Sequence, residues 1–317
     1  MHHIEIVVPC FNEQECIRPL YNKVEEILKN IEDIKFSFLF VNDGSKDKTL
    51  LEIKSLVMDK GSDAVKYISF ARNFGKESGI YAGLEKSRGD YVVLMDADLQ
   101  HPPELIPDML KAMDEGYDCC GARRVSRKGE PLIRSFFSNY FYNLFGKMTG
   151  MHLVPGGSDY RMMSRQMVEA ILSLTERERF TKGIMSWVGF DTKWIDYENV
   201  ERLAGKSKWS FWGLAKYAWN GFIGFATTPL RAAVYIGLIT VLISIVEGIK
   251  LFVRTMKYGT SGNGFVTIVL LIFLLSGVII TILGVIGEYL ARIYLELKRR
   301  PIYIAKETNI EEENIGS

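Results

Sequence analysis

The fold is indicated first by residues 91–104, which read Tyr91-Val-Val-Leu-Met-Asp-Ala-Asp-Leu-Gln-His-Pro-Pro-Glu104. The first five residues form a short apolar run, which is typical of a strand buried on both faces. Pro102 and Pro103 then end the strand and favour the start of a helix. In open α/β sheets, ligands bind beyond the carboxyl ends of such strands. The acidic residues between strand and helix therefore belong to a candidate site.

Asp96, Asp98 and Gln100 are candidate metal ligands. If the backbone stays extended through them, alternation puts all three on one side of the chain. Carboxylate and amide oxygens suit Mg²⁺ or Mn²⁺, and such a metal would clamp a nucleotide diphosphate. The plainer alternative is a strand-end turn, because an Asp-x-Asp triplet is expected about once by chance in a chain of this length.

The composition argues against a nucleic-acid partner. The 317 residues include 39 Lys and Arg and 38 Asp and Glu, which gives a net charge of +1 and no general basic surface. Hydrophobic residues make up 48% of the chain, but long apolar runs are confined to residues 232–295. The preceding part is therefore expected to form an α/β domain in water.

The four cysteines are predicted to be reduced, buried and structural, as in cytosolic proteins. Cys119 and Cys120 are adjacent and cannot easily close a disulfide, and no Cys-x-x-Cys spacing for zinc is present. The N-terminal sequence has neither a basic start nor a cleavable apolar segment, so no signal peptide is predicted.

Apolar runs alternate with helical spacings as far as residue 121. Strands are predicted at 4–8, 36–41, 65–70, 91–95 and 117–121, which indicates βαβ units and a mainly parallel sheet. Right-handed crossovers bring the loops that follow the strands to one edge of the sheet. None of these loops carries the glycine pattern of a dinucleotide fold or a P-loop, so a bound nucleotide would depend on acidic side chains and a metal.

Two apolar segments, at about 231–253 and 265–290, predict transmembrane helices. Residues 266–287 carry no charge over 22 positions, and such a helix is about 33 Å long, enough to cross a bilayer core. The first segment reaches full length only past Glu247 and Lys250, which could pair. More basic residues flank the two spans on the side of the large domain, so the protein is predicted to be a multi-pass plasma-membrane or inner-membrane protein with that domain in the cytoplasm.

These segments divide the chain into four predicted parts. Residues 1–205 form the cytoplasmic domain, 206–229 an interfacial segment, 230–295 the two spans and 296–317 a cytoplasmic tail. The interfacial prediction depends on Trp and Tyr interspersed with Lys, for which the alternative is an amphipathic helix over the domain core. The tail is predicted to be disordered from Glu307 onward, because it is polar and acidic.

A basic cluster between Arg123 and Arg134 could bind the phosphate of a lipid acceptor, together with Arg161 and two lysines near residue 207. Arginine suits phosphate because its planar fork donates two parallel hydrogen bonds. The alternative is ordinary solvated surface charge. A diphosphate-binding domain joined to membrane helices suggests one soluble and one lipid substrate.

Together, several motifs resemble those of the polyprenyl-phosphate glycosyltransferases of glycosyltransferase family 2. In chain order they are VPCFNE at 8–13, NDGS at 42–45, FARNFGK at 70–76, DADLQHPPE at 96–104 and KSKW at 206–209. The family includes dolichol-phosphate mannose synthases. The two predicted C-terminal spans make the chain most similar to the bactoprenol glucosyltransferases.

The resemblance implies a GT-A fold and inverting transfer of a single hexose from a nucleotide sugar to a polyprenyl phosphate. It implies that the donor is held by Pro9, Phe11, Asn12, Glu13, Val41, Asp43, Ser45, Lys76, Asp96 and Ala97. It implies Mg²⁺ or Mn²⁺ bound by Asp96, Asp98 and Gln100. The acceptor phosphate is expected at Arg123, Arg134, Ser138, Arg161, Arg202, Lys206 and Lys208. A homo-oligomer, namely a tetramer, is expected from similar proteins.

Asp98 and Asp159 are the predicted catalytic residues. The metal would neutralise the departing diphosphate. The attacking phosphate oxygen is largely ionised at neutral pH, because its second pKa is about 6, so no strong base is needed. Asp159 occupies the position of the acidic residue that is often proposed as a base in the family, and it would orient the acceptor or take a residual proton. Its alternative role is to cap the turn that follows Gly156 and Gly157.

The favoured reaction is transfer of glucose from UDP-glucose to undecaprenyl phosphate, which supplies a donor for cell-envelope glycosylation. Mannose or an aminosugar is an alternative on the same lipid. A processive polysaccharide synthase is disfavoured, because no Gln in the chain begins a Gln-x-x-Arg-Trp motif. A membrane-anchored nucleotide-sugar-binding protein without catalysis remains the alternative from another class, and the intact acidic residues argue against it.

Overall fold

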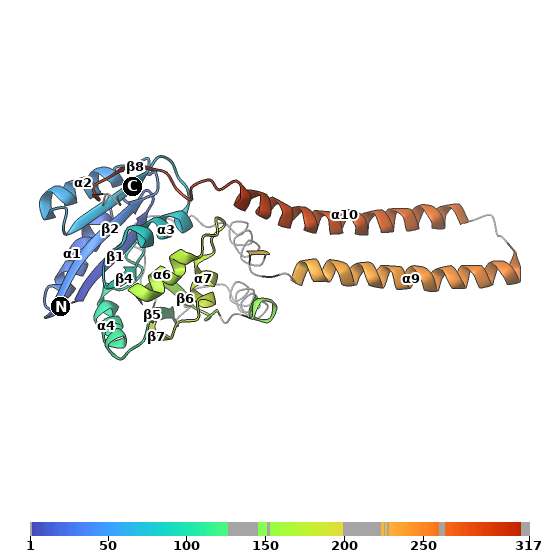
Figure 1. Cartoon of the computed structure of the whole chain (residues 1–317), viewed down its shortest axis with the longest axis horizontal. Coiled ribbons are helices and arrows are strands. Elements are labelled where there is room, and N and C mark those ends of the chain that lie inside the picture. The colour runs from blue at the N-terminus through green and yellow to red at the C-terminus, as the bar shows by residue number, and fades with distance from the viewer. Residues whose placement is uncertain are drawn as a thin grey trace, which may run out of the picture. The chain divides into compact units, whose positions relative to one another are not determined.

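The computed structural model describes residues 2–125, 145–150, 153–198, 223–224, 226, 228–259 and 264–311. The chain divides into two compact units (Figure 1). The first comprises Met1–Ala218 together with Arg300–Ser317, and the second comprises Trp219–Arg299. The polypeptide thus leaves the first unit once and returns to it after the second.

The first unit is built on an eight-stranded sheet in the order β7-β5-β6-β4-β1-β2-β3-β8. Strand β1 pairs in parallel with β2 and β4, β2 pairs in parallel with β3, and β5 with β7. Strand β6 is antiparallel to β4 and β5, and β8 is antiparallel to β3. The strands are β1 His2–Cys10, β2 Ile34–Asn42, β3 Val65–Phe70, β4 Tyr91–Leu94, β5 Cys119–Arg124, β6 Gly157–Ser164, β7 Thr192–Tyr197 and β8 Ala305–Thr308.

Helices cover both faces of this sheet. They are α1 Ile17–Leu28, α2 Thr49–Lys60, α3 Lys76–Lys86, the 3-10 turn η1 Pro103–Leu105, α4 Ile106–Asp114, α6 Arg165–Ser173 and α7 Thr181–Trp187. Ile4, Ile6 and Val8 of β1 belong to the core formed with α1, α2 and α4. Val7, on the other face, meets α3 at Gly83, where an added Cβ would lie 2.2 Å from the Val7 Cγ1. β1 is therefore apolar on both sides, as its sequence indicates.

The predicted strands and the mainly parallel sheet are confirmed. Strand β3 has the predicted bounds, while β5 begins two residues later than predicted, because Tyr117 and Asp118 still belong to the bend that precedes it. All four cysteines are buried and free, as expected.

The extended backbone expected through Asp96, Asp98 and Gln100 is wrong. Strand β4 ends at Leu94, and the chain turns at Ala97 and Asp98. Leu99 has a φ of +56°, and the backbone N–H of Gln100 donates to the Asp98 carboxylate at 3.2 Å. A hydrogen-bonded turn therefore presents these side chains, and strand alternation does not align them.

The disordered tail expected from Glu307 is wrong for residues 307–311. Strand β8 pairs with the edge strand β3, so the backbone groups that an acidic, polar tail would give to water are bonded to the sheet. The Thr308 hydroxyl donates to the Tyr67 carbonyl at 2.7 Å. Polar composition favoured disorder, but polar side chains can also satisfy an exposed sheet edge.

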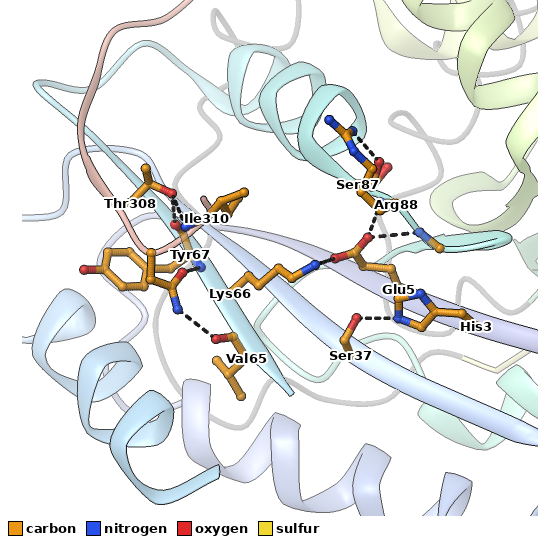
Figure 2. Close-up of polar contacts among 12 residues, drawn as sticks. His3, Glu5, Ser37, Val65, Lys66, Tyr67, Ser87, Arg88, Thr308 and Ile310 are labelled. Atoms are coloured by element: carbon orange, nitrogen blue, oxygen red, sulfur yellow. Dashed lines mark hydrogen bonds and ion pairs between the residues drawn. The ribbon is translucent and has the colours of Figure 1, made fainter. Parts of the chain in front are cut away.

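A buried carboxylate, Glu5, joins β1 to its surroundings (Figure 2). It accepts hydrogen bonds from the backbone N–H groups of Arg88 and Gly89, at 3.1 Å for Gly89. The Lys66 ammonium of β3 lies 3.5 Å from it. Glu5 therefore holds the connection between α3 and β4 against the sheet, a role that the sequence did not indicate.

The second unit contains α9 Thr228–Tyr258 and α10 Gly264–Leu297. Over Thr228–Tyr258 and Leu271–Leu297 these helices are long and apolar enough to cross a membrane, as expected. Lys250 lies 2.7 Å from Glu247, so the two charges within the first span form a pair. The Tyr289 hydroxyl donates to the Ala226 carbonyl at 2.6 Å within the same unit.

The substitution Glu5→Ala is expected to lower the free energy of unfolding of the first unit by about 2–5 kcal/mol, because it leaves buried N–H groups without an acceptor. The thermal midpoint in detergent, followed by tryptophan fluorescence, should fall by roughly 5–15 °C. The exposed Glu32→Ala is the matched control, and an equal midpoint in the two variants would contradict the role of Glu5.

Candidate active site

The loops that follow β1 and β2 are bonded to each other at the carboxyl edge of the sheet. The Asn12 N–H donates to the Ser45 hydroxyl at 2.9 Å, and the Lys46 N–H donates to the Asn12 side-chain oxygen at 2.8 Å. The Glu13 N–H donates to the Thr49 hydroxyl at 2.9 Å. Asn12 and Ser45, both predicted to contact the donor, thus shape the loops themselves.

Asp43 joins these loops to the segment 71–75, which follows β3. Its carboxylate accepts hydrogen bonds from the N–H groups of Phe74 at 2.6 Å and Gly75 at 2.9 Å. Burial raises the pKa of the Asp43 carboxyl, and these two bonds only partly oppose the rise. Gly44 has a φ of +64°, and an added Cβ would lie 2.4 Å from the backbone of Arg72. Glycine therefore lets the two loops touch.

Lys76 bridges two carboxylates from distant parts of the chain. Its ammonium lies 2.8 Å from Asp96 and 2.9 Å from Asp159. Lys76 begins α3, Asp96 follows β4, and Asp159 lies in β6. Leu94 of β4 is paired with Arg161 of antiparallel β6, so continuing this register by two residues puts Asp96 opposite Asp159. The Lys76 side chain is 39% exposed and that of Asp159 is 18% exposed.

This bridge fixes the charges of its members. Burial alone would raise the pKa of the Asp96 and Asp159 carboxyls, but the Lys76 ammonium outweighs it and lowers both values. The Lys182 ammonium lowers the pKa of Asp159 further. Burial would lower the pKa of Lys76, yet the two carboxylates raise it. At neutral pH the cluster therefore holds two anions and one cation.

The residues fit a divalent cation that is bound jointly with a diphosphate. Two carboxylates, Asp96 and Asp98, and the amide of Gln100 are hard oxygen donors. A cation, the Lys76 ammonium, already contacts Asp96. In the described ranges, no three His, Cys, Asp or Glu side chains are gathered as a metal site. A metal would therefore need further oxygen ligands from the diphosphate. It would also need an oxygen of the Asp96 carboxylate, which the Lys76 ammonium now contacts.

A cavity of about 440 Å³ lies against β6, β7 and α7. Arg161 and Lys182 supply its positive charge, and Trp187, Phe190 and Trp194 are among its aromatic lining residues. Arg161 is buried, and its Nε has no hydrogen-bond partner within the described part of the chain. The cavity therefore combines cationic groups with an apolar wall, which suits an anion that carries a hydrocarbon chain.

Lys182 is held by a contact between two helices. The Glu77 carboxylate of α3 accepts a hydrogen bond from the Thr181 N–H of α7 at 2.9 Å and another from the Thr181 hydroxyl. The Lys182 ammonium donates to the Gly157 carbonyl at 3.0 Å. Sequence analysis missed Lys182, because it belongs to no motif and its neighbours in the site come from other elements.

The other predicted site residues are spread over several parts of the domain, and some of them do not face the Lys76 cluster. Arg123 forms a two-pronged pair with Asp196 on the neighbouring strand, at 2.6 and 2.9 Å. Val41 is fully buried, beside Gly79 and Gly83 of α3, and Ala97 is buried too. Pro9, near the end of β1, is partly exposed, and so are Phe11 and Glu13 in the loop that follows. The predicted residues that lie outside the described ranges are Arg134, Ser138, Arg202, Lys206 and Lys208.

A protein-family model described as Glycosyl transferase family 2 matches residues 5–172. The chain belongs to glycosyltransferase family 2. This glycosyltransferase is 44% identical over 307 residues to CsbB of Bacillus subtilis (strain 168), covering 97% of this chain and 92% of the relative. It is 39% identical over 306 residues to the bactoprenol glucosyl transferase of Shigella phage SfII, covering 96% of this chain and 98% of that protein.

The predicted family, enzyme class and GT-A fold are thereby confirmed. Among solved structures, mannosyl-3-phosphoglycerate synthase from Rubrobacter xylanophilus matches this glycosyltransferase with a TM-score of 0.49 at 16% identity, covering 73% of this chain and 74% of that chain.

The substitution Lys76→Met is expected to lower the thermal midpoint of the glycosyltransferase by an amount that depends on pH. The lowered pKa of Asp96 and Asp159 means that their stabilisation is complete above about pH 4 and is lost as pH falls through the folded-state values. The raised pKa of Lys76 means that its contribution is complete below about pH 10. Without Lys76, burial and mutual repulsion raise the pKa of both carboxyls in the variant. The difference in midpoint between wild type and variant should therefore be largest near neutral pH and shrink as the pH falls toward 4 and below.

The same variant tests the metal site without an activity assay. Mn²⁺ should raise the midpoint of Lys76→Met more than that of the wild type, because the Lys76 ammonium no longer competes with the metal for the Asp96 carboxylate. Lys111→Met, on the exposed surface, is the control. An equal response to Mn²⁺ in all three proteins would contradict a metal position that Lys76 shares.

Proposed function

We propose that this glycosyltransferase transfers one glucose from UDP-glucose to the phosphate of undecaprenyl phosphate, with inversion at the anomeric carbon. The observation that carries the proposal is the position of anionic Asp159 in the same strand as Arg161, which lines a cavity that is both cationic and aromatic. Two helices able to span a membrane give the enzyme access to a lipid. The names of several relatives, bactoprenol glucosyl transferase, support this acceptor and this sugar.

The donor would lie across the loops at the carboxyl edge of the sheet. Phe11, Glu13 and Asp43 lie in the loops that would meet the nucleoside. Asp96 would release the Lys76 ammonium when it binds the metal, and that ammonium would then contact the diphosphate. A Mg²⁺ or Mn²⁺ ion held by Asp96, Asp98 and Gln100 would supply positive charge to the departing diphosphate. Lys76 then stays beside both the leaving group and Asp159.

The acceptor phosphate would lie between Arg161 and Lys182, with the isoprenoid chain along the aromatic wall. At neutral pH most of the phosphate is doubly ionised, since its second pKa is about 6, so the nucleophile needs little activation. The lowered pKa of Asp159 makes it a weak base. We therefore assign it to orientation, because it holds Lys76 and attracts Lys182 at the side from which the phosphate attacks.

A soluble nucleotide-sugar donor supports a cytoplasmic catalytic domain, because such a donor would be supplied there. The excess of Lys and Arg beside the spans on the domain side supports the same orientation. The division of the chain into four parts, with boundaries after residues 205, 229 and 295, stays a prediction from the sequence, and the predicted tail contains β8. The homotetramer stays a prediction as well.

Transfer of labelled sugar from a panel of UDP- and GDP-sugars to undecaprenyl phosphate tests the reaction. Wild type should label the lipid from UDP-glucose when Mg²⁺ or Mn²⁺ is present, and chelation should abolish it. Asp98→Ala should lose about 10²-fold or more in kcat, the size expected when charge stabilisation of a leaving group is removed. Asp63→Ala, an exposed carboxylate in a turn, is the matched control.

Labelling from GDP-mannose or a UDP-aminosugar instead would keep the lipid acceptor and replace the sugar. Binding of a nucleotide sugar with no labelled lipid from any donor would sink the transferase proposal and favour the membrane-anchored binding protein. Sealed inside-out vesicles that react with added donor without detergent would support the cytoplasmic orientation, and right-side-out vesicles that do so would oppose it.

Lys182→Met is expected to raise the KM for the lipid acceptor by about 10-fold or more, the loss of one charge-assisted hydrogen bond to phosphate. The dissociation constant for UDP should stay within about twofold, because the donor loops are unchanged. Lys193→Met, which loses an exposed pair with Glu115, is the control. A KM for the acceptor that does not change would remove Lys182 from the acceptor site.

A further inference from the structure

The segment that follows the second apolar helix binds along the edge of the catalytic sheet. Residues 301–310, here called the C-terminal clasp, include β8, in which Thr308 is paired with Ile68 of β3. The Asn309 side chain accepts a hydrogen bond from the Tyr67 N–H at 2.7 Å and donates to the Val65 carbonyl at 3.0 Å. Figure 2 shows Thr308 and Ile310 of the clasp beside Val65 and Tyr67 of β3. Side chains thus continue the pairing beyond the last strand residue.

The beginning of the clasp contacts the point at which β3 ends and the loop 71–75 starts. The Tyr303 ring stacks on Phe70 with centroids 4.9 Å apart. Its hydroxyl donates to the Glu85 carboxylate of α3 at 2.6 Å. The Ala71 N–H donates to the Ile304 carbonyl at 3.0 Å. The backbone N–H of the first loop residue is therefore held by the clasp.

From this point, contacts lead directly to the donor site. The Phe70 ring meets the Phe74 ring edge to face, with centroids 5.7 Å apart. The N–H groups of Phe74 and Gly75 then hold both oxygens of Asp43. The next residue is Lys76, whose ammonium bridges the two site carboxylates. Tyr303 is thus joined to Asp43 and Lys76 through two aromatic rings and one short loop.

We propose that the C-terminal clasp positions the donor site, with Tyr303 as the residue through which it holds the loop 71–75. Without the Tyr303 ring, Phe70 loses a packing partner. The Phe74 ring that rests on Phe70, and the amides that hold Asp43, are then free to move. Five residues, 298–302, lie between the end of α10 and Tyr303, so the connection from a membrane-span candidate to the clasp is short. The inference rests on the proposed function in so far as a nucleotide sugar binds at these loops.

Hydrogen exchange on the full-length protein in detergent tests the coupling without any substrate. In Tyr303→Ala, exchange of the amides of residues 71–75 should accelerate by about 3- to 10-fold, the loss expected for one aromatic pair, while β1 stays protected. Tyr303→Phe keeps the stacking on Phe70 and should restore the protection. Asn309→Ala loosens the far end of the clasp and should change the loop less. Lys306→Ala, at an exposed clasp position, is the matched control.

Calorimetric binding of UDP is the second measurement. Tyr303→Ala should weaken UDP binding by about 3- to 10-fold, and Tyr303→Phe should bind as the wild type does. If Tyr303→Ala folds and the exchange of residues 71–75 is unchanged, the proposal is overturned. It is also overturned if exchange becomes faster to the same extent across the whole sheet, because that result indicates a merely structural role. Loop exchange that responds to Tyr303 while wild type binds no UDP would overturn the proposed donor site and leave the coupling of clasp and loop supported.

Discussion

Two carboxylates that share one ammonium group determine the geometry of this site. Asp96 and Asp159 would repel each other at the distance that the Lys76 bridge brings them to, and their partial burial weakens the screening by water. The Lys76 ammonium turns that repulsion into a bridge. Lys76 begins α3, Asp96 follows β4 and Asp159 lies in β6. The arrangement of these three elements and the charge state of the site therefore depend on one another.

The sheet supplies this arrangement. Parallel pairing of β4, β1, β2 and β3 brings the loops after them to one edge, and antiparallel β6 then starts at that same edge. The first residues of β6 therefore face the turn that follows β4. Glycines where α3 meets the sheet let this helix approach closely enough for its first residue to reach both carboxylates.

Segments from both ends of the described chain contribute strands to the catalytic sheet, β1 in its interior and β8 at one edge. β1 begins at the second residue, and β8 is formed after both apolar helices, on the opposite edge from β7. β8 covers the six-residue strand β3 and becomes the edge strand itself, with only four residues. A shorter edge strand offers fewer backbone groups to a second molecule. The same strand brings Tyr303 against the loop that holds Asp43, so edge protection and loop order come from one segment.

The sequence by itself determined the first five strands, the helices between them, two helices apolar enough to span a membrane, the family and the acidic motif, because apolar periodicity and turn residues act over a few positions. Only the tertiary structure decided the turn at Leu99, the Lys76 bridge, the place of Lys182 and the strand β8. Lys76 and Asp159 are 83 residues apart, and Tyr67 and Asn309 are 242 apart. Contacts over such separations depend on the register of a whole sheet, and no local pattern encodes that register.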